Sequence, residues 1–551
     1  MVTLNNYNLP ADSFSILSDG LRRRLAPRGI GFACSAAEAD LVVDFGTDAE
    51  MTADSFSVTR SGKIVEIRAN NLCSVFAGAG WLMRAAEYDF HGGAVLPALP
   101  FSHKMKCSMR GMYFATHFHN FYHDAPIEEV YEIILDLALR GCNTLALIVG
   151  VQHYTSYFSP DATAMIERIR KMLRFADRCG IAPGMVLFSN SCFSNYPKQY
   201  EAQFKNTEGL YRQDLIAEFS TEVCPSTEGG MREIEREHRE FFEAFRGTPV
   251  KHFFLWAYDE GGCLCPKCYP WVTNGFMKVA ELDRRLVPEY GFDASISISA
   301  WHFDIQMEHE WETFYEPLSK GEYAWAPYVL TSFRAGRMPP VLSSRGIPEG
   351  VHLIEFPEIS MCNAKPWGGF GANPITMFLD NSWENLGPYH DGGLPYSEGI
   401  YEDINKFVCL GFYTGLYQRS ADAVRDYIRF EFGLTGEDQD QVLRSIQLME
   451  SSLTRSTELM ENGKYRFMPR WGTSIPEVRR LIAAADRRVP ENLRGSWKWR
   501  LVVLRSVIDY ELYSHGYIPS RSEKAQEAFA ELHRISHTEN AKFCVHPPLG
   551  M

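Results

Sequence analysis

The sequence predicts an α/β protein built around a (β/α)8 barrel, with a small α+β domain before it and a helical domain after it. From about residue 105, eight runs typical of buried strands alternate with longer helical or loop segments, and eight is the strand count of such a barrel. After about residue 415 the strand patterns stop and helical patterns take over. The expected domains are therefore 1–100, 101–415 and 416–551.

A predicted hairpin and a predicted helix define the N-terminal α+β domain. The run DLVVDFGT at 40–47 is typical of a strand, and SFSVTRSGKIVEIRA at 55–69 alternates around a Ser-Gly pair, which predicts a hairpin. LCSVFAGAGWLMRAAEY at 72–88 predicts a helix that packs on this sheet. The two prolines of LPALPF at 96–101 predict the linker to the barrel.

The predicted barrel alternates strands with amphipathic helices. In the first such helix Ile127, Val130, Ile134 and Leu137 fall on one face, and Gly141 follows as a stop. The eight predicted strands are MRGMYFAT (109–116), TLALIVG (144–150), GMVLFSN (184–190), HFFLWAY (252–258), SISISAW (295–301), YAWAPYVL (323–330), VHLIEF (351–356) and ITMFLDN (375–381).

The last domain is predicted to be helical. Val442, Ile446, Met449 and Leu453 share one helical face, and SWKWRLVVLRSVIDYELY at 496–513 predicts another long, mostly buried helix.

Composition indicates which partners and which cellular compartment to expect. A net charge of −14 argues against a nucleic-acid partner, and no apolar run approaches the roughly 18 residues of a membrane span. The start of the chain lacks a secretion-signal pattern, and the 13 cysteines follow no regular disulfide framework. We therefore expect reduced thiols, a cytoplasmic setting and no membrane partner, while a homo-oligomer stays open.

The clearest chemical feature is the pair of adjacent carboxylates Asp259 and Glu260, at the end of the fourth predicted strand. The carboxyl ends of barrel strands form the active-site face, and two close carboxylates raise the pKa of one of them. A protonated glutamate can protonate a glycosidic oxygen while its ionised partner stabilises positive charge, which fits glycoside cleavage. The alternative is that one carboxylate caps the next helix and the other is solvated.

These motifs resemble the β-N-acetylhexosaminidase clan, meaning glycoside hydrolase family 20 and its β-N-acetylgalactosaminidase relatives such as family 123. The small α+β domain before the barrel, the Arg-Gly start of MRGMYFATHFHNF, the segment ILDLALRGCNTLALIV and the Asp-Glu pair carry the resemblance. Two motifs of this chain differ from family 20. The family has Gly-Gly-Asp-Glu where this chain has Tyr-Asp-Glu-Gly-Gly, and the chain has LIVGVQHY where the family has a motif rich in His and Asp.

The resemblance implies an exo-acting retaining β-N-acetylhexosaminidase, for β-GalNAc or β-GlcNAc, on an oligosaccharide or glycoconjugate. Its nucleophile would be the substrate's own 2-acetamido oxygen, through an oxazolinium intermediate. Asp259 would orient the acetamido group, and Glu260 would act first as general acid and then as general base. Arg110 would bind sugar hydroxyls.

Further polar and aromatic residues near predicted strand ends are candidates for sugar binding. Aromatic rings form platforms for a sugar face, although core packing explains each of them equally well. A glutamate before the predicted helix that follows the last strand matches a sugar-binding glutamate of family 20. Besides Arg110, the candidates are His117, Trp301, Trp325, Tyr328, Trp383 and Glu398.

Two alternatives to the acetamido mechanism remain open. Glu355 and Glu358 flank the end of the seventh predicted strand, where many retaining barrels carry a glutamate nucleophile with the acid, here Glu260, on the fourth strand. Such an enzyme, or an α-glucuronidase-like one, needs no acetamido group; carboxyl groups about 5 Å apart would support it. The other alternative is a carbohydrate-binding barrel without catalysis.

Three cysteines follow the carboxylate pair closely. Cys263, Cys265 and Cys268 have the spacing C-x-C-x-x-C, which is compatible with a structural zinc site, with thiols that only pack the loop, or with a disulfide. A zinc site needs a fourth ligand, for which Cys224 and Cys192 are candidates. No cofactor is expected for catalysis, and the cluster is interpreted as scaffold for the loop after Glu260.

Overall fold

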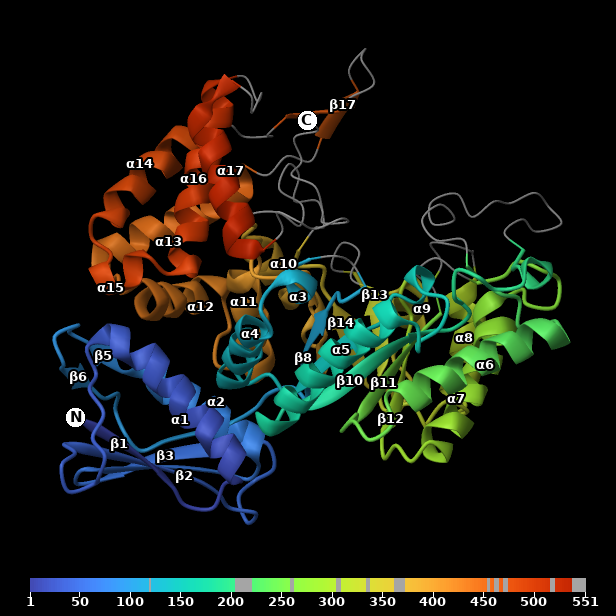
Figure 1. Ribbon diagram of the computed structural model, residues 1–551, viewed down its shortest axis with the longest axis horizontal. Coiled ribbons are helices and arrows are strands. Elements are labelled where there is room, and N and C mark those ends of the chain that lie inside the picture. Colours follow the sequence, from blue (N-terminus) through green and yellow to red (C-terminus); the bar gives the residue numbers. More distant parts are fainter. Residues whose placement is uncertain are drawn as a thin grey trace.

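The structure is a computed structural model, and the description below concerns the residues that it places. These are residues 1–117, 120–203, 221–257, 262–303, 309–332, 337–360, 372–452, 456–459, 465–468, 474–515 and 521–537. Figure 1 shows an N-terminal sheet with two helices, a central barrel and a separate group of C-terminal helices.

The N-terminal domain is a five-stranded sheet, in the order β1-β2-β4-β3-β7, packed against two helices. The predicted hairpin is present as the antiparallel pair β3–β4, and the predicted helix begins where the Asn71 side chain accepts a hydrogen bond from the backbone N–H of Ser74. Because β7 also joins this sheet, the sheet extends to Lys104. Its elements are β1 (Val2–Asn6), α1 (Ala11–Leu25), β2 (Leu41–Thr47), β3 (Ser55–Ser61), β4 (Ile64–Ala69), α2 (Leu72–Ala85) and β7 (Phe101–Lys104).

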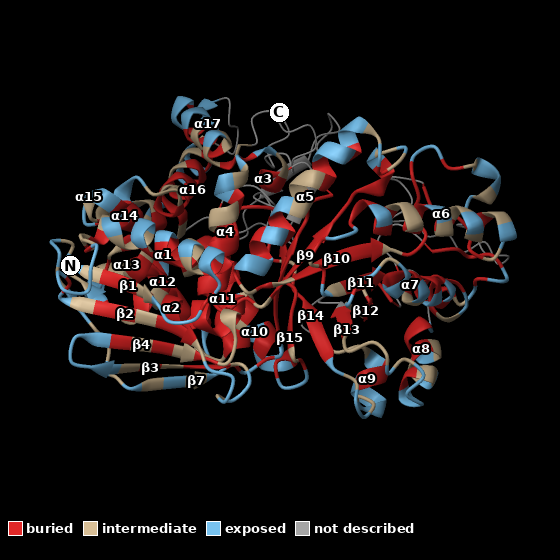
Figure 2. Cartoon of the chain, turned by 60° about the horizontal axis from the view of Figure 1, so that its bottom comes forward, coloured by how far each residue is buried: buried red, intermediate tan, exposed pale blue. Residues whose placement is uncertain are grey.

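The predicted (β/α)8 barrel is confirmed. Parallel strands run in the order β8 to β14, and β15 and β16 together supply the eighth position and close the ring by pairing with β8. The strands are β8 (Met109–Phe114), β9 (Thr144–Ile148), β10 (Ala182–Phe188), β11 (His252–Trp256), β12 (Ser295–Ser299), β13 (Val329–Ser332), β14 (Leu353–Phe356), β15 (Gly392–Gly393) and β16 (Tyr396–Ser397). Figure 2 shows these strands buried under a partly exposed layer of helices.

One of the eight strand predictions is wrong, and another is displaced. The run at 375–381 lies in helix α10, and the eighth strand is instead the short pair β15 and β16. The sixth strand, β13, begins only at Val329, so most of the predicted run at 323–330 precedes it.

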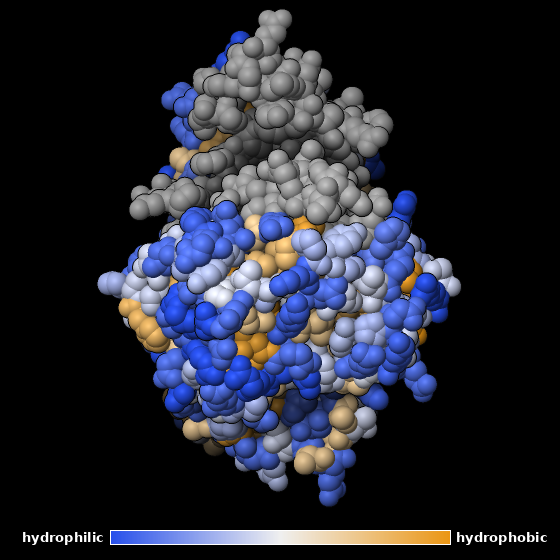
Figure 3. Space-filling view, turned by 90° about the vertical axis from the view of Figure 1, so that its right-hand side faces the viewer, coloured by the Kyte–Doolittle hydropathy of each residue, from blue (hydrophilic) through white to orange (hydrophobic). Residues whose placement is uncertain are grey.

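Helices surround the barrel and connect its strands. The predicted end of the first helix is confirmed, because Gly141 follows α4 with φ +88°. The layer contains α4 (Ile127–Leu139), α5 (Pro160–Arg178), α6 (Glu228–Ala244), α7 (Met277–Glu289), α8 (Glu310–Ser319), α9 (Pro340–Arg345), α10 (Thr376–Leu386) and α11 (Asp403–Thr414). The side of the molecule seen in Figure 3 is mostly hydrophilic where it is coloured, with scattered apolar residues.

Most of the described C-terminal residues form helices, as the sequence predicts. They are α12 (Ser420–Tyr427), α13 (Gly436–Ser451), α14 (Ile475–Asp486), α15 (Glu491–Arg494), α16 (Trp497–Ser514) and α17 (Glu523–Ser536). A short antiparallel pair, β17 (Ser456–Leu459) and β18 (Tyr465–Met468), accompanies them. In the described part of the chain, no helix is both long enough and apolar enough to cross a membrane.

Buried ion pairs join these helices to the barrel. Asp403 on α11 accepts two hydrogen bonds from the Arg140 guanidinium, of 2.7 and 3.0 Å. Lys498 on α16 lies 2.8 Å from Asp136 and 2.6 Å from Glu431. Burial alone would raise the pKa of Asp403, but the positive charges of Arg140 and Lys498 outweigh it and lower that pKa to about 2. The network stays charged and fixes the C-terminal helices on the barrel.

Candidate active site

Aromatic rings inside the barrel form the floor of its carboxyl end. Tyr113 on β8 lies against the rings of Phe356 and Tyr396, each at a centroid distance of 5.4 Å. Trp256, the last residue of β11, packs edge-on against Phe356 at 5.2 Å. Half-buried Trp301 follows β12 and lies on the same Phe356 ring at 5.1 Å, so the predicted platform residue does lie at this end of the barrel.

The predicted catalytic pair, Asp259 and Glu260, lies outside the described residues, but the chain is fixed on both sides of it. Before the pair, the carbonyl of Ala257 accepts hydrogen bonds from Trp271 Nε1 (2.9 Å) and Ser189 Oγ (3.3 Å). These partners hold the chain as it leaves the carboxyl end of β11.

After the pair, one asparagine holds Gly262 at both of its backbone groups. Asn190, which follows β10, donates to the Gly262 carbonyl at 3.2 Å and accepts from the Gly262 N–H at 3.2 Å. It also donates to the Val223 carbonyl at 3.0 Å. Gly262 has φ +100°, a conformation that favours glycine.

Two glutamates lie together at the carboxyl ends of β14 and β16. Glu358 forms a parallel bridge with Tyr396, and the Ser360 N–H donates to Glu358 Oε1 at 3.3 Å. The Tyr396 hydroxyl donates to Glu398 Oε1 at 2.9 Å. Burial, and secondly the charge of Glu358, raise the pKa of Glu398 well above its ordinary value. The raised pKa favours the neutral form of the Glu398 carboxyl group beside Glu358.

The backbone around Glu398 is held by a third glutamate. Glu402 Oε1 accepts hydrogen bonds from the N–H groups of Glu398 (2.8 Å) and Gly399 (2.9 Å) and from the Ser397 hydroxyl (2.6 Å). The Glu398 N–H also donates to Ser360 Oγ at 3.0 Å. These bonds connect the chain that carries Glu398 to the one that carries Glu358.

Glu355 does not lie with Glu358 and Glu398. The prediction that either Glu355 or Glu358 is the nucleophile is therefore corrected for Glu355. Along β14 the side chains alternate, and Ile354 and Phe356 belong to the cluster inside the barrel. Glu355 therefore points outward, where it accepts a 2.6 Å hydrogen bond from the Tyr413 hydroxyl of α11. Burial raises its pKa to about 7 despite that bond.

His117 lies three residues beyond the end of β8, near the aromatic floor. Its Nδ1 is 3.5 Å from the Tyr113 hydroxyl, and its ring meets Phe188 edge-on. Burial, with a smaller contribution from His153, lowers its pKa to about 3. A neutral imidazole at this position is suited to hydrogen bonding with a sugar hydroxyl.

Arg110 lies near the opposite, amino end of the barrel, and its predicted sugar contact is corrected. Because Met109 and Tyr113 point into the barrel, strand alternation directs Arg110 outward. The fully buried guanidinium pairs with Asp54 of the N-terminal domain at 2.8 and 3.0 Å and donates to the carbonyls of Gly141 and Cys107. It joins two domains.

Trp325 and Tyr328 also lie at the amino end, because β13 begins after both of them. The Tyr328 hydroxyl donates to Ser108 Oγ at 3.1 Å, immediately before β8. The Trp325 ring accepts the Arg284 guanidinium on its face at 4.7 Å. The prediction that Trp325 and Tyr328 contact the substrate is corrected, because both side chains pack within the protein.

Trp383 belongs to the helical layer and not to the carboxyl end of the barrel. It is buried on α10, where its ring stacks on Phe412 at 5.9 Å and meets Tyr413 at 5.3 Å. The ammonium group of Lys106 lies 4.9 Å from its centre. Its prediction as a sugar contact is corrected.

The three cysteines after the carboxylate pair meet a fourth. Their sulfur atoms and that of Cys224 all lie within 4.8 Å of one another, and all four residues are buried. We call Cys224, Cys263, Cys265 and Cys268 the thiol cluster. Cys192, the other predicted candidate for the fourth ligand, is not part of it.

Several positioning residues escape sequence reasoning. Asn190 and Trp271 act on backbone groups distant in sequence, whereas Glu402 binds groups three to five residues before it, and no motif marks any of the three. Tyr396 has a signal in hindsight, because it lies two residues before Glu398 and so points in the same direction along a strand.

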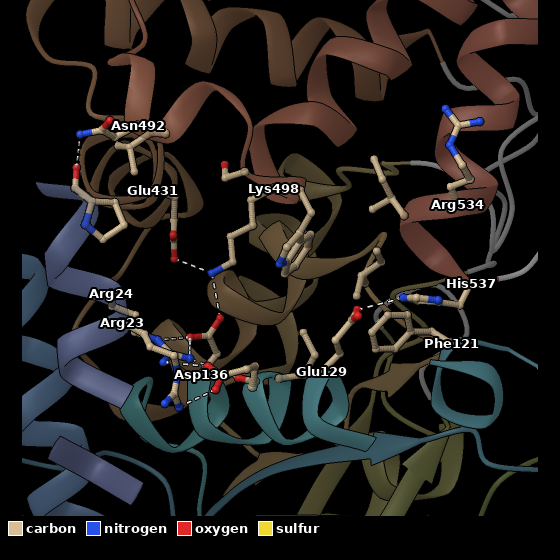
Figure 4. A pocket seen from close by; sticks show the side chains of 18 of the residues that line it. Arg23, Arg24, Phe121, Glu129, Asp136, Glu431, Asn492, Lys498, Arg534 and His537 are labelled. Atoms are coloured by element: carbon tan, nitrogen blue, oxygen red, sulfur yellow. Dashed lines mark hydrogen bonds and ion pairs between the residues drawn. The ribbon is translucent and has the colours of Figure 1, made fainter. Parts of the chain in front are cut away.

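A cavity of about 580 Å³ lies between α1, α4 and the C-terminal helices (Figure 4). Its charged lining residues pair with one another: Arg24 with Asp136 at 2.6 Å, and His537 with Glu129 at 3.0 Å. Figure 4 shows these pairs, with Lys498 between Asp136 and Glu431. We interpret this cavity as a charged domain junction.

No protein-family model and no curated protein matches the chain. Among solved structures, a family 138 glycoside hydrolase that targets pectin rhamnogalacturonan II matches with a TM-score of 0.59 at 12% identity, over 97% of this chain and 71% of that one. A family 89 glycoside hydrolase from Clostridium perfringens matches with a TM-score of 0.60 at 13% identity, over 95% of this chain and 65% of that one. This chain therefore spans just under two thirds of the family 89 enzyme.

Structures of family 20 enzymes match less well. The β-N-acetylhexosaminidase from Streptomyces coelicolor has a TM-score of 0.49 at 13% identity, over 81% of this chain and 91% of that one. The resemblance to family 20 stays a prediction. What the structural matches establish is the fold: a (β/α)8 barrel with flanking domains, shared with glycoside hydrolases.

Proposed function

We propose that the protein is a retaining glycoside hydrolase that acts on a terminal sugar, with Glu358 as nucleophile and Glu260 as acid and base. The observation that carries this proposal is the position of Glu358, at the carboxyl end of the seventh barrel strand beside the buried Glu398, whose pKa is raised. The fourth strand, β11, ends at the same face, directly before the Asp259–Glu260 pair.

Each group has a defined part in the reaction. Glu358 attacks the anomeric carbon while Glu260 gives its proton to the departing oxygen, and a covalent glycosyl-enzyme forms. Water then attacks the same carbon, Glu260 takes its proton, and Glu358 leaves as a carboxylate, so the configuration is retained. Neutral Glu398 keeps a second negative charge away from the nucleophile and offers a proton donor for a hydrogen bond.

The surroundings support sugar binding. Trp301 presents a half-buried ring at the edge of an aromatic floor, and neutral His117 lies on the same floor. Two structural relatives act on carbohydrates. The family 89 enzyme, with two glutamates replaced by glutamine, binds GlcNAc-α-1,4-galactose, and the family 138 enzyme targets a pectin.

The acetamido mechanism is the second candidate. In its favour, Asp259 and Glu260 adjoin each other at the end of β11, between backbone groups held by Trp271 and Asn190. In this version the enzyme is an exo-acting β-N-acetylhexosaminidase, Asp259 stabilises an oxazolinium, and Glu358 is not a nucleophile.

Kinetics of two isosteric variants distinguish the candidates, once a panel of nitrophenyl α- and β-glycosides with 2-acetamido, 2-hydroxy and uronate sugars has identified a substrate. With Glu358 as nucleophile, Glu358→Gln lowers kcat by about 10³-fold or more, because a neutral amide does not form the glycosyl ester. Asp259→Asn then has the smaller effect. The reverse ranking, together with inhibition by a thiazoline, supports the acetamido mechanism.

A panel without any hydrolysis contradicts both candidates. If sugars nevertheless bind in calorimetry, the barrel is a carbohydrate-binding module without catalysis.

A further inference from the structure

We propose that the thiol cluster is a structural zinc site. Cys224 Sγ lies 3.8 Å from the Sγ atoms of both Cys265 and Cys268. Four thiolates around zinc, with bonds of about 2.3 Å at tetrahedral angles, place their sulfurs about 3.8 Å apart. A disulfide requires a sulfur separation of about 2.05 Å, so the arrangement is that of ligands around a common centre.

The atoms around the sulfurs suit thiolates. The Gln203 N–H donates to Cys263 Sγ at 3.4 Å, and the hydroxyl of Ser226 lies 2.9 Å from Cys268 Sγ. Lys278 donates in turn to Ser226 Oγ at 3.0 Å, which brings a positive charge behind that hydroxyl. Hydrogen-bond donors and a cation next to the ligands stabilise the excess negative charge that four thiolates leave on a zinc centre.

The ligand set identifies the metal and its role. Thiolates are soft ligands that select zinc over magnesium or calcium, and four of them leave no open position for water or substrate. The site is therefore closed and structural. Carboxylate chemistry at Glu358 and Glu260 needs no metal, so this inference goes beyond the proposed function.

The zinc would fasten the loop that follows Glu260. Three ligands come from residues 263–268, and the fourth, Cys224, comes from the segment before α6. The same two segments are also joined by Asn190, which bonds to Val223 and Gly262. Loss of the metal removes the stronger of these two connections. The consequence for catalysis rests on the proposed function; the metal site itself does not.

Metal analysis of the full chain tests the proposal. Protein purified without a metal-affinity column, then incubated with zinc and desalted, is expected to hold about one zinc ion per chain by plasma mass spectrometry. Cys224→Ser and Cys265→Ser are expected to lose it. Cys409→Ser, which changes another buried free cysteine on α11, is the matched control and is expected to keep it.

Cobalt substitution of the wild-type chain gives a second readout that does not depend on a variant folding. Tetrahedral cobalt thiolate has strong visible absorption, and zinc is expected to displace it stoichiometrically. Less than about 0.1 zinc per chain without a cobalt spectrum, or equal zinc in Cys224→Ser and Cys409→Ser, overturns the proposal. Iron in place of zinc in the isolated protein overturns the choice of metal. None of these measurements uses a substrate, so they stand apart from the test of glycosidase activity.

Discussion

Replacing Asn190 by alanine tests how the loop that carries the catalytic pair is positioned. The substitution removes the 3.2 Å bonds to the N–H and the carbonyl of Gly262 and the 3.0 Å bond to the Val223 carbonyl. Buried polar groups left without partners cost about 1–3 kcal/mol each, partly recovered by water, so we expect a loss of about 2–4 kcal/mol in the free energy of unfolding. Because Gly262 lies two residues after Glu260, a shift of about 1 Å lowers kcat by about 10²-fold.

Asn143→Ala is the matched control at the opposite end of the barrel. Asn143 also bridges backbone groups: it accepts from the Arg110 N–H at 2.9 Å and donates to the Ser108 carbonyl at 2.7 Å. Asn143 is half-buried and its bond to Ser108 is exposed, so urea unfolding is expected to show a loss of stability in both variants that is smaller for Asn143→Ala. Michaelis kinetics, at a temperature where both are folded, are expected to show a fall in kcat for Asn190→Ala alone. Equal kcat in the two variants would refute the positioning role.

Three further predictions follow from buried charges. Arg110→Met is expected to cost about 2–4 kcal/mol of unfolding free energy, because it breaks the pair with Asp54, and to leave KM unchanged; unaltered stability with a raised KM would instead support a sugar contact for Arg110. The pKa of Asp403 is lowered to about 2 in the folded protein and is about 3.9 in the unfolded chain. Its ion pairs therefore stabilise the fold fully above about pH 3.9, and this stabilisation is lost as the pH falls toward about 2. Asp403→Asn is therefore expected to flatten the acid limb of stability in urea titrations, and an unchanged slope would contradict this. The pKa of Glu398 is raised, so its cost to stability grows as pH rises above about 4.3. Glu398→Gln is then expected to gain stability relative to the wild type as the pH rises from 4 to 7. A difference in unfolding free energy between the two proteins that does not change with pH would show that Glu398 is ionised.

The sequence predicts most of the barrel because buried parallel strands are short apolar runs and the helices between them are amphipathic. The eighth strand is missed because it is two short pieces around a Gly-Gly pair, while the apolar run of α10 resembles a strand. Local pattern does not separate a short buried strand from a buried helical segment.

The site is only partly predictable, for a different reason. Both faces of a barrel strand are buried, so alternation alone does not say which set of side chains faces the interior. Arg110 and Glu355 point out of the barrel, whereas Glu358 and Glu398 lie beyond the carboxyl ends of β14 and β16. The partnership of Cys224 with the later cysteines depends on long-range folding, and spacing alone left two candidates for it.

The central claim, that Glu358 is the nucleophile, is tested most directly by trapping the glycosyl-enzyme. A 5-fluoro glycosyl fluoride of the sugar that the substrate panel identifies slows the second step more than formation of the covalent bond. Peptide mass spectrometry after digestion is expected to find the sugar attached to Glu358, and Glu358→Gln is expected to give no adduct. An adduct on another carboxylate, or steady turnover without any adduct together with inhibition by a thiazoline, would contradict the account.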